Sequence, residues 1–260
     1  MIRLVSAAEA GARRYFMNLP NGVGNWVTSY MGVTAAEARA RGLADLASSI
    51  APVPVAYLVE QPPESTIAGH YHQIDQFQVF VSGDGTFGSK KLDGVHLHYA
   101  AAYTPYAPIS AGRQPLRYFT LRPGFDPGAQ WMPESRARLL SEKRAFRAET
   151  ARFDIGSTAA NVQTSSCTVL VDQDATGVGA WLYRVGTGAR VELMAPSHGG
   201  GQFLLVLRGA CDVSGYRAGE HAVAHIGAQD SAAVLVGGPE GVHALLVQFA
   251  RQGNDAVASS

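Results

Sequence analysis

The stretch that decides the fold is Gly69-His70-Tyr71-His72-Gln73-Ile74-Asp75-Gln76-Phe77-Gln78-Val79-Phe80-Val81-Ser82-Gly83. Its second half is a short β-rich run that ends at a glycine, which is typical of a strand followed by a turn. A related frame, Gln202-Phe203-Leu204-Leu205-Val206-Leu207-Arg208-Gly209, returns 126 positions further along the chain. The same offset relates His72 to His198, and 118–121 to 244–247. Three matches in one register predict a duplicated β unit.

Short strand-like runs dominate the remaining chain. They are Val53–Glu60, Phe77–Val81, Val95–Tyr99, Arg117–Arg122, Thr168–Val171, Ala180–Val185, Phe203–Leu207 and Ala244–Phe249. With 29 glycines and 13 prolines spread between them, these runs predict an all-β sandwich or barrel rather than alternating β and α elements.

Two segments have a helical pattern. Thr34-Ala35-Ala36-Glu37 has capping-box spacing, and its helix is expected to continue to Leu46. Pro133–Ala148 predicts a second helix, whose basic residues form either a solvated face or a grip on an anionic ligand.

The repeat and these helices together predict the domain organisation. We expect an N-terminal extension (1–50), a first β unit (51–125), a helical linker (126–159), a second β unit (160–250) and a C-terminal tail (251–260).

Composition excludes several classes of protein. Charged residues are 16% of the 260 and apolar residues 47%, so most of the chain is expected to fold around a sizeable core. The net charge of zero gives no attraction to nucleic acid, and no apolar run is long enough for a membrane span. Two cysteines exclude a disulfide framework, and with no signal-peptide pattern we expect a cytoplasmic protein. Low charge and open sheet edges suggest a homodimer, with a monomer as the alternative.

Four of the eight histidines form two pairs with a spacing of two residues. His70 and His72 are one pair, and His96 and His98 are the other. On a strand, residues two apart project to the same face, so each pair offers two imidazoles from one element. Gln76 and Gln78 have matching parity and could add an amide oxygen. Imidazoles suit Fe, Mn, Ni, Cu or Zn, and the residues do not choose among these metals. The face that carries His96 and His98 is either solvent or the barrel interior.

The segment Gly69-His70-x-His72-x3-Gln76, followed by a strand and Ser82-Gly83-Asp84-Gly85, resembles the first signature of the cupin superfamily. With the duplication, residues 51–250 resemble a bicupin. The resemblance implies two tandem cupin-type β-barrels, with His70 and His72 as metal ligands and Gln76 in the place of the usual glutamate. The second signature lacks its histidine, so the fourth ligand is absent, or is Tyr106, His96 or His98.

In the second repeat only His198 survives, because Pro196 takes the place of the first histidine. A proline has no side-chain donor or acceptor, so the second barrel is expected to be metal-free and structural.

The resemblance favours a metal-dependent enzyme, most simply a dioxygenase that uses Fe(II) and O2 on a small aromatic or oxygenated organic substrate. Gln76 would bind the metal or orient a ligand, and Tyr106, with Tyr99 or Tyr103, would line the pocket and donate to a substrate oxygen. Two alternatives stay open: a non-catalytic small-ligand sensor with a decayed metal site, and a cupin isomerase or lyase.

Overall fold

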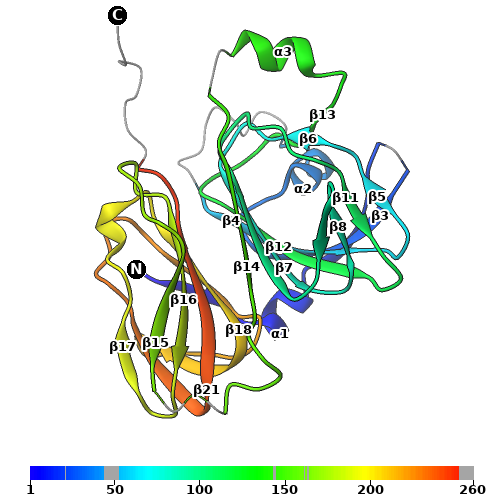
Figure 1. The fold of residues 1–260 in the computed structure, drawn as a ribbon. Coiled ribbons are helices and arrows are strands. Elements are labelled where there is room, and N and C mark those ends of the chain that lie inside the picture. Colours follow the sequence, from blue (N-terminus) through cyan, green and yellow to red (C-terminus); the bar gives the residue numbers. More distant parts are fainter. Residues whose placement is uncertain (21, 44–52, 143–144, 161, 163, 252–260) are drawn as a thin grey trace, which may run out of the picture. The chain divides into compact units, whose positions relative to one another are not determined.

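The structure, a computed structural model, describes residues 1–260 except 21, 44–52, 143–144, 161, 163 and 252–260. The chain divides into two compact units (Figure 1), which we call the first unit (5–156) and the second unit (157–260 with 1–4). Strands make up 49% of the residues and helices 8%. The predicted all-β class is confirmed.

The first unit is built from a seven-stranded antiparallel sheet, a four-stranded sheet and a two-stranded sheet. The first sheet has the order β14 (Ala148–Phe153), β10 (Val95–Ala100), β7 (Gln76–Ser82), β12 (Leu116–Arg122), β4 (Val55–Gln61), β3 (Gly24–Met31) and β2 (Arg14–Asn18). The second sheet has the order β5 (Thr66–Ile67), β11 (Ile109–Ala111), β8 (Gly85–Phe87) and β9 (Lys90–Leu92). The third pairs β13 (Gln130–Trp131) with β6 (His70–Tyr71).

A hydrophobic cluster joins the two larger sheets of the first unit. Phe80 and Tyr118 come from the seven-stranded sheet, and Leu92 and Ile109 come from the four-stranded sheet. All four are buried. Because alternate residues of a strand face the same side, the inward positions of β7 and β12 include Gln76, Gln78, Thr120 and Arg122 as well. The sheet therefore carries polar side chains into the barrel beside its apolar core.

The second unit contains one sheet of eight strands. Its path is β1 (Arg3–Val5), β20 (Val223–Ile226), β18 (Gln202–Val213), β21 (Val234–Gln248), β16 (Gly179–Val185) and β15 (Ser166–Val171), while β17 (Arg190–Glu192) pairs with β21 and β19 (Tyr216–Ala218) with β18. Its interior is apolar: Trp181, Tyr183, Leu204 and Leu246 belong to one buried cluster. All eight runs predicted from the sequence overlap a strand of one unit or the other.

The glycine of the repeated frame has the same structural role in both units. Gly83 and Gly209 have φ values of 93° and 79°. A Cβ atom would lie 2.2 Å from the Pro115 carbonyl oxygen at Gly83, and 2.3 Å from the Gly241 carbonyl oxygen at Gly209. Positions 115 and 241 are themselves 126 residues apart. The frame thus ends in glycine because the backbone turns with a positive φ and passes close to a neighbouring strand.

Part of the expected N-terminal extension (1–50) belongs to the first unit's sheet. Strands β2 and β3 continue the seven-stranded sheet, because β3 pairs along its length with β4 and β2 pairs with β3. Along the chain, α2 (Ala35–Ala40) lies between β3 and β4, and it starts at the predicted capping box of Thr34 and Glu37. Its expected continuation to Leu46 reaches into 44–52, outside the described residues. A shorter helix, α1 (Ala7–Gly11), lies near the start of the chain.

Among the described residues of the expected helical linker (126–159), one short segment is helical and others are strands. The helix within it, α3 (Arg136–Ser141), has six residues, and the apolar side chains of Leu140 and Phe146 in this segment are exposed. Strand β14 then pairs with β10, so residues 148–153 belong to the first unit's sheet.

In the second unit, Pro196 and His198 lie in the short 3-10 helix η2 (Pro196–His198). Most of the predicted tail lies outside the described residues. No helix in the described ranges is both long and apolar enough to cross a membrane.

The two frame glycines give a test of the repeat. We expect Gly83→Ala and Gly209→Ala each to lower the free energy of unfolding by more than about 2 kcal/mol, because positive φ and a backbone clash act together. Gly215→Ala is the matched control: its φ is 94°, but nothing lies within 4 Å of a Cβ there, so about 1 kcal/mol is expected. Urea denaturation measures all three. Equal losses in the three variants would contradict the shared role.

Candidate functional site

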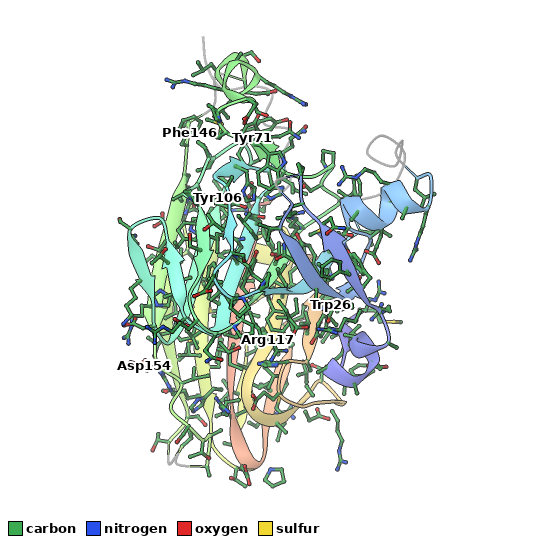
Figure 2. The ribbon with its side chains drawn as sticks, turned by 90° about the vertical axis from the view of Figure 1, so that its right-hand side faces the viewer. Trp26, Tyr71, Tyr106, Arg117, Phe146 and Asp154 are labelled. Atoms are coloured by element: carbon green, nitrogen blue, oxygen red, sulfur yellow. The ribbon has the colours of Figure 1, made fainter. Side chains whose placement is uncertain are left out.

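The first unit contains a cavity of about 390 Å³, which we call the main cavity. Its walls come from β2, β3, β4, β7 and β12, from the first turn of α2, and from the segments around His70 and Trp131. Tyr106, labelled in Figure 2, lies beside β6 and is joined to it by a backbone bridge at His70. His70, His72, Tyr106 and Arg122 all line the main cavity.

His70 is held as a neutral acceptor. Its Nδ1 lies 2.7 Å from the carbonyl oxygen of Ala68. A carbonyl only accepts, so Nδ1 carries the proton and Nε2 presents a lone pair. The Tyr106 hydroxyl, 2.7 Å away, donates to Nε2 and itself accepts from the amide of Gln76 at 2.9 Å. Burial lowers the pKa of His70 to about 3, with the neighbouring His72 adding to the effect. Burial raises the pKa of Tyr106, so its proton stays in place.

His72 is also neutral and also has its proton on Nδ1. This nitrogen lies 2.8 Å from Oδ2 of Asp126, a side chain buried in the loop after β12. Burial and the charge of Arg122 lower the pKa of His72. Burial alone would raise the pKa of Asp126, but Arg122 and His72 hold it well below its usual range. His72 therefore donates to a carboxylate through Nδ1 and has only its Nε2 lone pair left.

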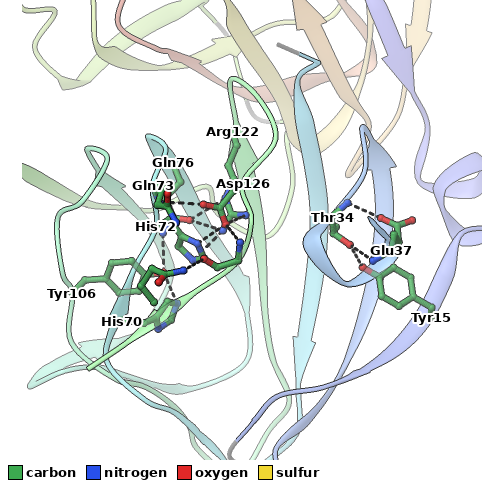
Figure 3. A network of polar contacts seen from close by, with 12 residues as sticks. Tyr15, Thr34, Glu37, His70, His72, Gln73, Gln76, Tyr106, Arg122 and Asp126 are labelled. Carbon is green, nitrogen blue, oxygen red and sulfur yellow. Dashed lines mark hydrogen bonds and ion pairs between the residues drawn. The ribbon is translucent and has the colours of Figure 1, made fainter. Parts of the chain in front are cut away.

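The guanidinium of Arg122 donates a hydrogen bond to that lone pair (Figure 3). Nη2 donates to Nε2 of His72 at 3.0 Å and to Oε1 of Gln76 at 3.0 Å. Nε also donates to Oε1 of Gln76, and Nη1 donates to Asp126 at 3.2 Å. Arg122 is only 4% exposed. Its charge is balanced by Asp126, so the cluster carries no net charge.

The structure brings together four of the residues predicted from the sequence: His70, His72, Gln76 and Tyr106. Their atoms form one hydrogen-bonded network. Sequence reasoning missed Arg122 and Asp126, which complete that network. A signal for Arg122 was present, since it shares strand parity with Tyr118 and Thr120 and a charged residue at an inward position requires a partner. Asp126 lies in a loop, where no periodicity marks it.

The second histidine pair does not join this network. His96 lies with Nε2 2.8 Å from the Asp93 carbonyl oxygen. His98 is buried between the rings of Phe87 and Tyr106, with centroid distances of 4.4 and 5.4 Å. Both histidines line a separate cavity of about 130 Å³. Tyr99 and Tyr103 are not among the residues lining the main cavity either; Tyr99 donates to Asp75.

The donor set of the network does not fit a metal ion in this arrangement. The Nε2 lone pair of His70 accepts from Tyr106, and that of His72 accepts from Arg122. Oε1 of Gln76 accepts two hydrogen bonds from the same guanidinium. Metal ligands need free lone pairs, and a guanidinium repels a metal cation. Within the described part of the chain, no three His, Cys, Asp or Glu side chains form a group that could hold a metal.

The described residues of the second unit do not form a second copy of this hydrogen-bonded network. His198, at the position equivalent to His72, is exposed, and Pro196 is buried with no donor or acceptor in its side chain.

His98 gives a pH-dependent test. Burial lowers its pKa to about 4, whereas an unfolded histidine has a pKa of about 6.5. Between about pH 6.5 and about pH 4, only the unfolded chain binds a proton at His98. The buried neutral His98 therefore lowers the free energy of unfolding as the pH falls through this range. We expect the wild type to lose about 2 kcal/mol more than His98→Phe between about pH 7 and about pH 5. Urea denaturation at both pH values checks this, and equal losses would contradict a neutral buried His98.

Comparisons with known proteins place this geometry on a known fold. No protein-family model matches the chain, and no curated protein sequence matches it significantly. Among solved structures, a Nostoc punctiforme protein provisionally described as a dioxygenase has a TM-score of 0.62 at 14% identity, covering 100% of this chain and 87% of its own. The bacterial pirin YhhW of Escherichia coli, in complex with nickel(II), has a TM-score of 0.55 at 13% identity, with coverages of 96% and 100%.

An oxalate decarboxylase of Lactobacillus farciminis, in a formate complex, has a TM-score of 0.54 at 11% identity, with coverages of 95% and 86%. All three matches run over nearly the whole of this chain, through both units, and all three are two-barrel cupins. The chain therefore has the cupin fold in its two-barrel form, the bicupin.

Proposed function

We propose that the first unit binds a small oxygenated organic molecule in the main cavity. The observation that carries this proposal is a pair of unpartnered amides in the cavity wall. Asn25 is 1% exposed and neither of its side-chain polar atoms has a hydrogen-bond partner. Gln78 is 3% exposed and its Oε1 has no partner. Both residues line the main cavity.

Unpartnered buried amides are costly, at about 1–3 kcal/mol each. Their presence in a cavity wall is explained if a ligand supplies the missing partners. The two amide oxygens require a donor such as a hydroxyl group, and the Asn25 amide nitrogen requires an oxygen acceptor. A molecule with both hydroxyl and carbonyl or ether oxygens meets these needs.

The rest of the wall favours a flat, neutral or anionic molecule. Tyr57, Tyr118 and Trp131 supply aromatic surface. Arg122 and Arg39 are the charged residues of the lining in the described part of the chain, and no carboxylate is among them. Since Asp126 balances Arg122, the exposed Arg39 leaves a positive charge in the lining.

A metal-dependent dioxygenase is the second candidate function. The observation in its favour is that His70 and His72 present imidazoles to the main cavity from one short segment, with ring centroids 5.1 Å apart. An Fe(II) site there would require the Arg122 guanidinium to leave both His72 and Gln76. Oxygen uptake with catechol, lost in His72→Ala and kept in His198→Ala, would establish this function and replace the metal-independent one.

Asn25→Leu tests the binding function. The two side chains have the same number of heavy atoms and the same branching at Cγ, and leucine removes the unpartnered amide. We expect the free energy of unfolding of the ligand-free protein to rise by about 1 kcal/mol or more. We also expect ligands that stabilise the wild type in a thermal-shift screen of phenols, hydroxy acids and keto acids to bind Asn25→Leu about tenfold more weakly.

The matched control is His198→Ala, which changes an exposed residue of the second unit and should bind each ligand as the wild type does. A destabilised Asn25→Leu variant with unchanged ligand affinity would show that the amide serves the fold and not a ligand.

A further inference from the structure

The position of Arg122 within the network is unusual for a buried arginine. It is the last residue of β12. Its guanidinium donates to Nε2 of His72 and to Oε1 of Gln76, and Gln76 in turn donates to the hydroxyl of Tyr106. These are the acceptors that a metal ion would otherwise organise. The guanidinium donates to Nε2 of His72, the same nitrogen whose lone pair a metal ion would use.

We infer that Arg122 is a protein-borne cation that takes the place of the metal ion, so that the site works without a metal. A bound cation does two things for such a cluster: it orients the lone pairs around it, and it fixes where the protons lie. Arg122 does both. It remains charged at every pH at which the protein is folded, and its pKa is raised further beside Tyr57 and Asp126, although burial opposes this.

The direction of every hydrogen bond follows from this one group. Because Arg122 occupies Oε1 of Gln76, the amide nitrogen of Gln76 faces Tyr106 and donates to it. The Tyr106 hydroxyl must then donate its own hydrogen bond, and it does so to Nε2 of His70. His70 in turn donates a hydrogen bond from its Nδ1–H to the carbonyl oxygen of Ala68. The chain of donors runs from the cation to the backbone without a free lone pair on either imidazole.

The second unit makes the equivalent side-chain contact without a cation. The residues 126 positions after Gln76 and Arg122 are Gln202 and Gln248. Gln202 donates to Gln248 at 2.8 Å, so the side-chain contact between these two strands is present in both units. In the second unit two neutral amides make that contact inside an apolar interior. A guanidinium makes it only beside the histidines.

Metal binding by the wild type and by Arg122 variants tests the inference. Purified wild-type protein should hold no stoichiometric transition metal and should not bind added Ni²⁺ or Co²⁺ in calorimetry. Arg122→Ala frees the Nε2 lone pair of His72 and Oε1 of Gln76, so it should bind Ni²⁺ in calorimetry under the conditions in which the wild type does not. Arg117→Ala, on the same strand, is the matched control and should behave as the wild type.

Two further measurements keep the test decisive if Arg122→Ala is unstable, since it leaves Asp126 buried without its cation. Arg122→Gln removes the charge but keeps an amide donor, and it too should gain Ni²⁺ binding. In the wild type, nitrogen NMR should show His70 and His72 as neutral Nδ1–H tautomers whose signals do not change when Ni²⁺ is added.

Wild-type Ni²⁺ binding that is lost in His72→Ala would overturn the inference, as would folded Arg122 variants that gain no affinity. These outcomes are separate from those of the proposed function, because they use metal ions alone and no organic ligand. A protein that binds an organic molecule and also a metal would keep the proposed function and lose this inference.

Discussion

The buried guanidinium of Arg122 is the interaction on which the arrangement of the site depends. A buried cation is tolerated only when it is paired and hydrogen-bonded, and Asp126, Gln76 and His72 provide those partners. Removing one partner would strand a charge inside the barrel, so the four side chains are constrained together. That constraint extends through Gln76 to Tyr106 and His70. The site is therefore one rigid unit with fixed proton positions, and not a set of independent ligands.

Much of the fold follows from local features of the sequence. Gly83 and Gly209 mark the repeat because both backbones require positive φ at a close approach, and Thr34 and Glu37 mark a helix start through contacts only three residues apart. Strands β2 and β3 were not predictable in the same way. Strand β3 pairs with β4, whose paired residues lie 25 to 34 positions away, and β2 joins the sheet through β3. Local propensity carries little information about such partners.

The residues of the candidate site also differ in how far the sequence could predict them. His70, His72 and Gln76 are close in sequence, so their spacing predicted that they would meet. Tyr106 was found only through the family resemblance, and the structure joins it to His70 by a backbone bridge. Arg122 and Asp126 come from a strand end and a loop about fifty residues away. Their role depends on tertiary packing. The prediction of a metal site failed to include them because the histidine spacing is the same whether the nearby cation is a metal or an arginine.

The two units solve the same packing problem with different interiors. The second unit fills its barrel with apolar side chains such as Trp181 and Leu246, and burial of that surface is favourable without any ligand. The first unit leaves a cavity in which Asn25 and Gln78 lack partners and in which a charge is buried. Each of these features costs stability, and a stable apo protein would lose nothing by replacing them with leucine. Their joint presence at one cavity is the feature that distinguishes the first unit from the second, and it is the observation on which the proposed binding of a small molecule rests.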